Sequence, residues 1–335
     1  MVFVTGGTGL LGSHLLLELL RRGGPIRALC REGSDLERIR RLHRLLEPEA
    51  IAWWERIEWV RGDLNDLPSL ERALQGVTEV WHCAARVSFD PREQEALLRD
   101  NAEGTANLVN ACLAGQVQRF CHVSSIATVD GTGGMLDESD SWDPARSSVY
   151  ATSKYLAEME AWRAGQEGLP TLIVNPGVIL GPGFWEAGSG KFFARVAEGL
   201  RYFPPGGTGF IGAADTARMM IRLMEGGFTG ERFILISENL SYRELLEAIA
   251  SRLNLAPPRK ELKRWHLELL WRLDALRGAL LGKPRFLTRS VVRSLRGRST
   301  YSNARVRSAL GVEPEPIRQV LDRCAGHFLR ERSAG

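Results

Sequence analysis

The chain has 335 residues, of which 44% are hydrophobic and 25% charged, and this composition excludes a wholly disordered protein. The length suits one large domain or two smaller ones. No apolar run approaches the roughly 18 residues of a membrane-spanning helix, and the first residues show no secretory signal. Five scattered cysteines without a CxxC pair argue against disulfides and metal sites. We therefore expect a cytoplasmic protein that binds no metal.

The first half of the chain alternates strand-like and helical patterns. Strands are predicted at residues 2–5, 26–30, 57–60, 80–83, 120–123 and 172–175. Helices are predicted at residues 10–22, 36–46, 67–74, 102–114 and 149–165. A further strand is predicted at 233–236. This alternation is typical of an α/β fold with a doubly wound parallel sheet, the Rossmann type.

The pattern changes after residue 176. Glycine, proline and aromatic residues dominate 177–212 and favour loops, and two or three helices follow residue 242. The sequence thus predicts a dinucleotide-binding domain at 1–176, to which 213–236 returns, and a smaller, mainly helical substrate lobe at 177–212 and 237–335. Six aromatic residues of the lobe either line an apolar pocket or pack its core: Phe184, Trp185, Phe192, Phe193, Tyr202 and Phe203.

The net charge of +4 is unevenly spread. Residues 259–307 hold 14 Lys and Arg against three acids, a local charge of +11 that leaves −7 for the rest. Apolar residues from Trp265 to Leu281 interleave these charges at helical spacing and predict an amphipathic helix. Either it packs on its own domain, or it offers a surface to an anionic membrane or an acidic partner. No nucleic-acid module accompanies the charge, and we expect no nucleic-acid binding.

The strongest local motif is the glycine-rich sequence TGGTGLLG at residues 5–12. It follows the first predicted strand and opens the first helix, where missing Cβ atoms permit a tight turn and close approach of a pyrophosphate. The phosphate then lies on the free N–H groups of the helix N-terminus. The motif predicts cofactor contacts from Gly6, Gly9, Leu10, Leu11 and Gly12.

Arg31 follows the second predicted strand, the position that contacts the ribose of a bound dinucleotide. An arginine there favours the 2′-phosphate of NADP, with Arg38 as a second candidate cation. Glu32 could turn inward in its place, so NAD stays an alternative. Asp63 and Leu64 follow the third strand, where a carboxylate could meet the adenine amino group.

Tyr150 and Lys154 are four residues apart and share one face of a predicted helix. A nearby lysine, together with a cationic nicotinamide, favours the phenolate and lowers the tyrosine pKa. Tyr150 could then protonate a carbonyl oxygen or deprotonate an alcohol. Ser124 and Ser125 follow the fifth strand, where a hydroxyl can donate to a developing alkoxide. Asn101 is a candidate N-cap of the helix at 102–114.

Together these motifs resemble the extended short-chain dehydrogenase/reductase family. The matching segments follow the family's order over residues 1–183: TGGTGLLG, GDL at 62–64, HCAA at 82–85, NAEGTANL from 101, VSSIATV at 123–129, YATSK at 150–154 and NPGVILGP at 175–182. The resemblance implies that Tyr150 is the catalytic acid/base and that Lys154 is its partner on the ribose hydroxyls. It implies that Ser125, or else Ser124, holds the substrate oxygen, and that Asn101 supports the lysine through a water relay.

The resemblance also implies cofactor contacts from Ser124, Tyr150 and Lys154, and from four further residues: Ala84, Ala85, Pro176 and Val178. Two positions depart from the family pattern. Asn175 stands where many relatives carry Arg, and Asp130 stands where sugar-nucleotide members usually carry Tyr. Both departures argue against a nucleotide-sugar substrate.

Arg31, the basic apolar lobe and the segment KPRFLTR at 283–289 are most similar to dihydroflavonol-reductase and 3β-hydroxysteroid-dehydrogenase relatives. The resemblance therefore implies an NADP(H)-dependent oxidoreductase that reduces a ketone or aldehyde of a mainly apolar small molecule, or oxidises the alcohol. One alternative is a nucleotide-sugar epimerase or dehydratase that uses bound NAD transiently. Another is a non-catalytic dinucleotide-binding protein. Homodimers are common in this family, and a homodimer is a further expectation.

Overall fold

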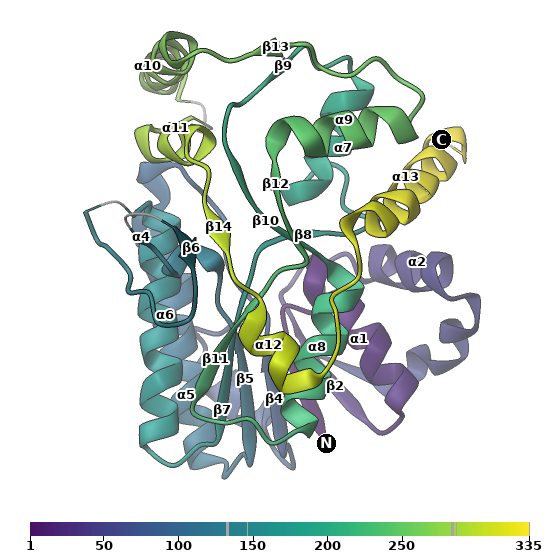
Figure 1. Cartoon of the computed structure of the whole chain (residues 1–335). Helices are drawn as coiled ribbons and strands as arrows, with labels where there is room; N and C mark the ends of the chain where they lie inside the picture. The colour runs from purple at the N-terminus through teal and green to yellow at the C-terminus, as the bar shows by residue number, and fades with distance from the viewer. Residues whose placement is uncertain (132–133, 146, 283–284, 286, 335) are drawn as a thin grey trace.

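The computed structural model describes residues 1–131, 134–145, 147–282, 285 and 287–334, so Lys283, Pro284 and Phe286 of the segment at 283–289 lie outside the described residues. Its centre is a parallel sheet in the order β11-β7-β5-β4-β1-β2-β3 (Figure 1). The strands are β1 (Val2–Thr5), β2 (Ile26–Cys30), β3 (Ile57–Arg61), β4 (Glu79–His82), β5 (Arg119–Val123), β7 (Thr171–Pro176) and β11 (Glu231–Leu235). The prediction of a doubly wound α/β sheet is confirmed.

Helices cover both faces of this sheet, as Figure 1 shows. On one face lie α1 (Leu10–Arg22), α2 (Leu36–Leu46) and α8 (Ala213–Glu225), and on the other lie α3 (Leu67–Ala73), α5 (Gly104–Ala114) and α6 (Val149–Gln166). Two separate clusters of buried side chains fill the two interfaces. A sheet that is buried on both faces needs nearly continuous apolar strands, which is why the strand-like runs are easy to find in the sequence.

The helix predicted at 102–114 begins earlier than expected. One continuous helical segment runs through α4 (Gln94–Leu97), a π-helical turn (Leu98–Glu103) and α5. Asn101 lies within the π-helical turn and not at a helix start, so its interpretation as an N-cap was wrong. A π-helical turn inside a helix often marks a functional site, and Asn101 has such a position here.

The prediction of loops over 177–212 was also wrong in part. This segment forms β8 (Val178–Leu180), α7 (Lys191–Ala197), β9 (Tyr202–Phe203) and β10 (Gly207–Gly212), and β10 lies between β8 and β12 (Glu238–Ser241) in a small second sheet. The glycines permit close backbone approach here. A Cβ on Gly177 would lie 2.5 Å from the Gly209 carbonyl oxygen, and one on Gly207 would lie 2.6 Å from the Leu240 oxygen. Glycine in a strand often has this meaning.

The C-terminal lobe packs around helices α7, α9 (Tyr242–Arg252) and α13 (Ile317–Ala334). Phe193 and Phe203 are buried in its core, and Trp185 and Phe192 pack against it, while Phe184 joins a small cluster with α2 and Tyr202 is 39% exposed. These contacts favour the core-packing interpretation of the aromatic residues over a pocket.

The remaining elements complete the C-terminal region: β13 (Lys260–Glu261), α10 (Arg264–Leu281), α11 (Arg289–Arg296), β14 (Thr300–Tyr301) and α12 (Ala304–Leu310), with β14 pairing β6 (Met135–Leu136). Helix α12 departs from the expected lobe, because Val306 is buried in the core of the large sheet beside α8. Among the described residues, no helix has both the length and the apolarity that a membrane span requires.

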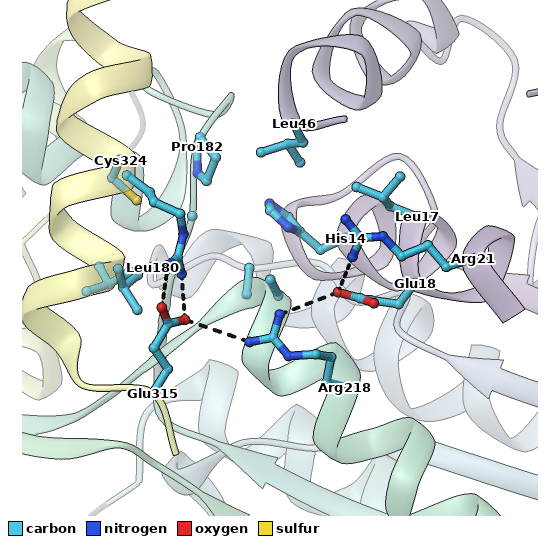
Figure 2. Close-up of a pocket in the computed structure, with 15 residues that line it drawn as sticks. His14, Leu17, Glu18, Arg21, Leu46, Leu180, Pro182, Arg218, Glu315 and Cys324 are labelled. Carbon is cyan, nitrogen blue, oxygen red and sulfur yellow. Dashed lines mark hydrogen bonds and ion pairs between the residues drawn. The ribbon is translucent and has the colours of Figure 1, made fainter. Parts of the chain in front are cut away.

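A cavity of about 310 Å³ lies between α1, α8 and α13 (Figure 2). Arg218 bridges its two sides, 3.5 Å from Glu18 and 3.7 Å from Glu315, and Arg323 also pairs with Glu315. These charges neutralise one another. The network therefore connects the chain before α13 to the large sheet domain.

Candidate active site

The glycine-rich turn between β1 and α1 has the geometry of an anion-binding loop. Gly6 has φ of +72°, and a Cβ on Gly12 would lie 2.1 Å from the Gly6 carbonyl oxygen. Gly9 is the N-cap of α1, and as a glycine it has no side chain to occupy the first N–H groups of the helix. The first turn of α1 contains no acidic residue. The N–H groups of this turn therefore face a potential phosphate with the positive end of the helix dipole.

Leu10 and Leu11 contribute to this site differently from the glycines. Leu11 is 7% exposed and belongs to the main core, while Leu10 packs against a cluster formed by Leu42 and Phe184. Their side chains thus hold α1 in place, and their contacts with a cofactor stay predictions.

A groove of about 320 Å³ runs from this turn along the carboxyl ends of β2, β3 and β4. Seven of the predicted cofactor residues line it together: Gly6, Gly9, Arg31, Asp63, Leu64, Ala84 and Ala85. The groove also includes Thr8 and Ser34, which the sequence analysis missed. Thr8 lies inside the glycine motif, and Ser34 lies three residues after Arg31. Their hydroxyl groups, close to predicted phosphate contacts, are the signal from which both residues could have been predicted.

The charged residues that follow β2 occupy different positions relative to the groove. Arg31 lines the groove, whereas the Glu32 side chain is 93% exposed and lies 4.0 Å from Arg61. Arg38 donates to the Gly183 carbonyl oxygen at 2.8 Å and lies over the Phe184 ring. The structure thus brings Arg31 to the groove and commits Arg38 to a loop instead.

Helix α6 places Tyr150 in its first turn, which Ser148 caps by accepting from the Ala151 N–H at 3.1 Å. The Tyr150 hydroxyl lies close enough to Ser125 for that side chain to influence its pKa, and its ring lies edge-on to Phe89 with 5.7 Å between centroids. Burial raises the pKa of Tyr150 above its ordinary value of 10, and the Ser125 side chain opposes this rise. The lowered tyrosine pKa that the sequence analysis expected from the nearby lysine is therefore wrong for the chain alone, where burial has the larger effect. In the chain alone the phenol is therefore protonated at neutral pH, as a proton donor requires.

Lys154 lies one turn further along α6 and is buried, with its Nζ donating to the Val123 carbonyl oxygen at 2.7 Å. Burial lowers the pKa of Lys154 to about 8, while the nearby Glu158 and Cys83 act in the opposite direction. Tyr150 and Lys154 lie one turn apart on α6, and Lys154 contacts the carboxyl end of β5.

Asn101 connects this helix to the cofactor groove. Its side-chain amide donates to Ser153 Oγ at 2.9 Å and to the Arg86 carbonyl oxygen at 3.0 Å, and it accepts from the Arg86 N–H at 2.7 Å. Arg86 lines the groove, and Ser153 lies between Tyr150 and Lys154. Asn101 therefore holds the proton-transfer pair beside the groove, and its relay to Lys154 stays a prediction.

A buried carboxylate that the sequence analysis missed lies behind this pair. Glu158 is fully buried, and its oxygens accept from Ser124 Oγ at 2.6 Å, Thr128 Oγ1 at 2.8 Å, Asn175 Nδ2 at 2.9 Å and Arg232 Nη1 at 3.1 Å. Asn175, the departure from the family pattern, thus has a structural partner. Because the Ser124 hydroxyl donates to Glu158, Ser125 is the better candidate of the two serines for a contact with the substrate oxygen.

Removing this carboxylate should destabilise the protein strongly. Glu158→Ala removes the only carboxylate paired with the Arg232 guanidinium, which then keeps only the Glu138 and Asp140 carbonyl oxygens as acceptors among the described residues. We expect a loss of about 3–5 kcal/mol in the free energy of unfolding. Glu160→Ala is the matched control on the same helix, because Glu160 is partly exposed and pairs with Arg163, a pair that contributes about 1 kcal/mol or less. Urea unfolding followed by circular dichroism measures both, and equal losses would contradict the prediction.

Pro176 and Val178 lie where β7 ends and β8 begins, at the same edge of the sheet as the end of β5. Pro176 is buried and Val178 is half-buried. Gly177 between them lies against Gly209. Neither residue belongs to the described lining of the groove, and their contacts with a cofactor stay predictions.

Comparison with known proteins gives a consistent assignment. The sequence profile of the family described as male sterility protein matches residues 4–239. A putative dihydroflavonol 4-reductase of Synechocystis is 31% identical over 95% of this chain and 92% of its own, and the sterol demethylase protein B of Methylococcus capsulatus is 31% identical over 73% and 72%.

Solved structures share the fold over almost the whole chain. The crystal structure of gox2253 superposes with a TM-score of 0.82 at 28% identity and covers 99% of this chain and 98% of its own. A dTDP-glucose 4,6-dehydratase from Streptomyces venezuelae has a TM-score of 0.77 at 22% identity, with coverage of 99% and 98%, which shows a common fold alone. The chain therefore belongs to the male sterility protein family and, with it, to the extended short-chain dehydrogenase/reductases, which are NAD(P)-dependent enzymes.

Proposed function

We propose that the protein is an NADP(H)-dependent oxidoreductase that reduces a ketone or aldehyde of a mainly apolar small molecule, or oxidises the corresponding alcohol. The observation that carries this proposal is the position of Tyr150 and the buried Lys154 one turn apart on a helix that Asn101 connects to the dinucleotide groove. A structural or sensing role for the dinucleotide would need no such pair.

The residues of the groove fit a dinucleotide, since the open N–H groups of α1 suit a pyrophosphate and the Arg31 guanidinium suits a further phosphate. When bound, the cofactor supplies or accepts the hydride. Tyr150 transfers its proton to the substrate oxygen, and the Ser125 hydroxyl orients that oxygen. The Lys154 ammonium, one turn away, stabilises the phenolate that remains. In the reverse direction the phenolate accepts the alcohol proton.

A preference for the 2′-phosphate is supported by Arg31 in the groove and by Glu32 turned toward Arg61. We expect Arg31→Ala to weaken NADPH binding about 10- to 100-fold, the loss of one charge-assisted contact, with little change for NADH. Arg38→Ala is the control, because Arg38 binds the Gly183 carbonyl oxygen and lies outside the groove. Titration calorimetry gives the Kd of each cofactor. Tighter binding of NADH by the unmodified protein would contradict the NADP assignment.

The apolar substrate class is supported by relatives named dihydroflavonol 4-reductase, tetraketide alpha-pyrone reductase and cinnamoyl-CoA reductase. The test is NADPH oxidation with aromatic ketones, steroid ketones and aldehydes, and with nucleotide sugars as the control panel. Net consumption of NADPH by a carbonyl compound supports the proposal. Conversion of a nucleotide sugar without net consumption would favour an epimerase or dehydratase instead.

A further inference from the structure

Helix α10 has an inward and an outward face, and the outward face is the apolar one. Leu267, Trp271, Asp274 and Gly278 follow one another at helical spacing and point toward the protein, with Leu267 and Gly278 buried. The opposite stripe consists of large apolar side chains that are 49–73% exposed: Trp265 60%, Leu269 49%, Leu273 52%, Leu276 55% and Leu280 73%. A soluble helix normally has the reverse arrangement.

This concentration is specific to α10. Leu270 and Leu281 on the same helix are also exposed, whereas exposed leucines elsewhere occur on separate elements, such as Leu67 on α3, Leu156 on α6 and Leu329 on α13. Single exposed leucines are ordinary, but a contiguous stripe marks an interaction surface. Figure 1 shows α10 at the outer end of the lobe, with α11 beside it.

An arginine-rich groove of about 650 Å³ adjoins the apolar stripe. It is lined by Arg264 of α10 and by Arg289, Arg293 and Arg296 of α11, with Glu261 and Glu268 as the acidic members. Glu268 already pairs with Arg272 at 2.9 Å and with Arg296 at 3.4 Å. Arg264 and Arg289 form no ion pair within the described part of the chain. The groove therefore keeps an excess of positive charge.

We propose that α10 and α11 dock this protein on the surface of a bilayer that contains anionic phospholipid. The apolar stripe of α10 enters the boundary between headgroups and acyl chains, with Trp265 at the interface. The arginine groove contacts lipid phosphates, each cation adding to the attraction. The helix lies on the bilayer and does not cross it.

Charge complementarity selects this occupant over a second copy of the chain. Residues 259–307 carry a net charge of +11 and the rest of the chain carries −7. In a two-fold dimer built on this surface, the same basic patch would face itself, and like charges at an interface are repulsive. An anionic membrane offers acyl chains to the apolar stripe and lipid phosphates to the basic groove.

The C-terminal end of α10 is connected to Tyr150 through the segment that contains Phe89, Asp90 and Arg92. At the end of α10, the Gly282 carbonyl oxygen accepts from Arg92 at 3.4 Å, and the Arg285 N–H donates to Asp90 at 2.8 Å. The neighbouring residue, Phe89, lies edge-on to the Tyr150 ring. A docked enzyme would therefore present its active site to substrates dissolved in the bilayer, a consequence that rests on the proposed function.

Vesicle co-sedimentation without any substrate tests the docking surface. The full chain should bind phosphatidylcholine vesicles that contain about one third phosphatidylserine more tightly than pure phosphatidylcholine, and high salt should weaken this binding. The variant Leu269→Ser/Leu273→Ser/Leu276→Ser should lose at least about tenfold in affinity. The matched control is Leu67→Ser/Leu156→Ser/Leu329→Ser, whose leucines are 44%, 40% and 43% exposed, and it should bind like the unmodified protein.

The charge component has its own variant. Arg264→Gln/Arg289→Gln should weaken binding to the phosphatidylserine vesicles by about fivefold per charge and leave binding to pure phosphatidylcholine unchanged. Absence of binding to the anionic vesicles, or an α10 triple variant that binds as tightly as its control, would overturn the proposal. So would a dimer in sedimentation velocity that the α10 variant dissociates, because the stripe would then bind a second copy. Since no substrate is present, a failed carbonyl-reduction assay leaves this result intact.

Discussion

Tyr150→Phe is expected to lower kcat about 10²- to 10⁴-fold, the usual contribution of a positioned proton donor, while the Kd for NADPH stays unchanged. The substitution removes only the hydroxyl group and leaves the ring in contact with Phe89. The groove is formed by other residues, from the turn at Gly6 to Arg86, so cofactor binding should survive. Steady-state rates on an active carbonyl substrate and a fluorescence titration with NADPH measure the two quantities.

Tyr155→Phe is the matched control for this experiment. Tyr155 lies on the same helix but stacks on Trp142 with 4.1 Å between ring centroids, away from Ser125. Its substitution should change kcat by less than about twofold. If Tyr150→Phe kept the turnover of the unmodified enzyme, the proton would come from another group and the proposed mechanism would fail.

The large sheet and the cofactor groove could be predicted from the sequence because local patterns determine them. The strands are apolar runs that are buried on both faces, and the glycine turn, Arg31 and Asp63 each follow a strand by a few residues. In a parallel sheet such positions meet at one edge without further information. Tyr150 and Lys154 needed only the helical repeat to be placed on the same face.

The parts that were missed depend on contacts between distant segments. Glu158 lies one turn beyond Lys154, yet nothing local shows that it accepts from Asn175 and from Arg232 on β11. The glycines of 177–212 have no local mark that separates a loop from a close backbone contact such as Gly177 against Gly209. The helix of α10 was predicted from its spacing, but which of its faces contacts the protein is decided by tertiary packing.

A second large effect is expected from acid, because the sheet domain buries neutral histidines. Burial lowers the pKa of His14 and of His82 to about 3, and it also lowers the pKa of His43 and of His122. Each histidine titrates near 6.5 in the unfolded chain, so the folded protein binds fewer protons below that pH. The contribution of these histidines to the free energy of unfolding is therefore fully present above pH 6.5. It is lost progressively as the pH falls toward the folded-state pKa values. Each such histidine contributes a slope of about 1.4 kcal/mol per pH unit.

His122→Phe isolates one of these contributions. Both ring nitrogens of His122 are buried and have no hydrogen-bond partner among the described residues, and its ring stacks on Phe120. A phenyl ring should therefore fit, and the variant should be at least as stable at pH 7.5. The free energy of unfolding of the variant should depend less steeply on pH, by the contribution of one histidine. At pH 5 it should exceed that of the unmodified protein by about 2 kcal/mol. Urea unfolding at pH 7.5, 6 and 5 measures this difference. Parallel stability curves for the two proteins would show that His122 takes up no proton on unfolding, and the acid sensitivity would then have to come from other groups.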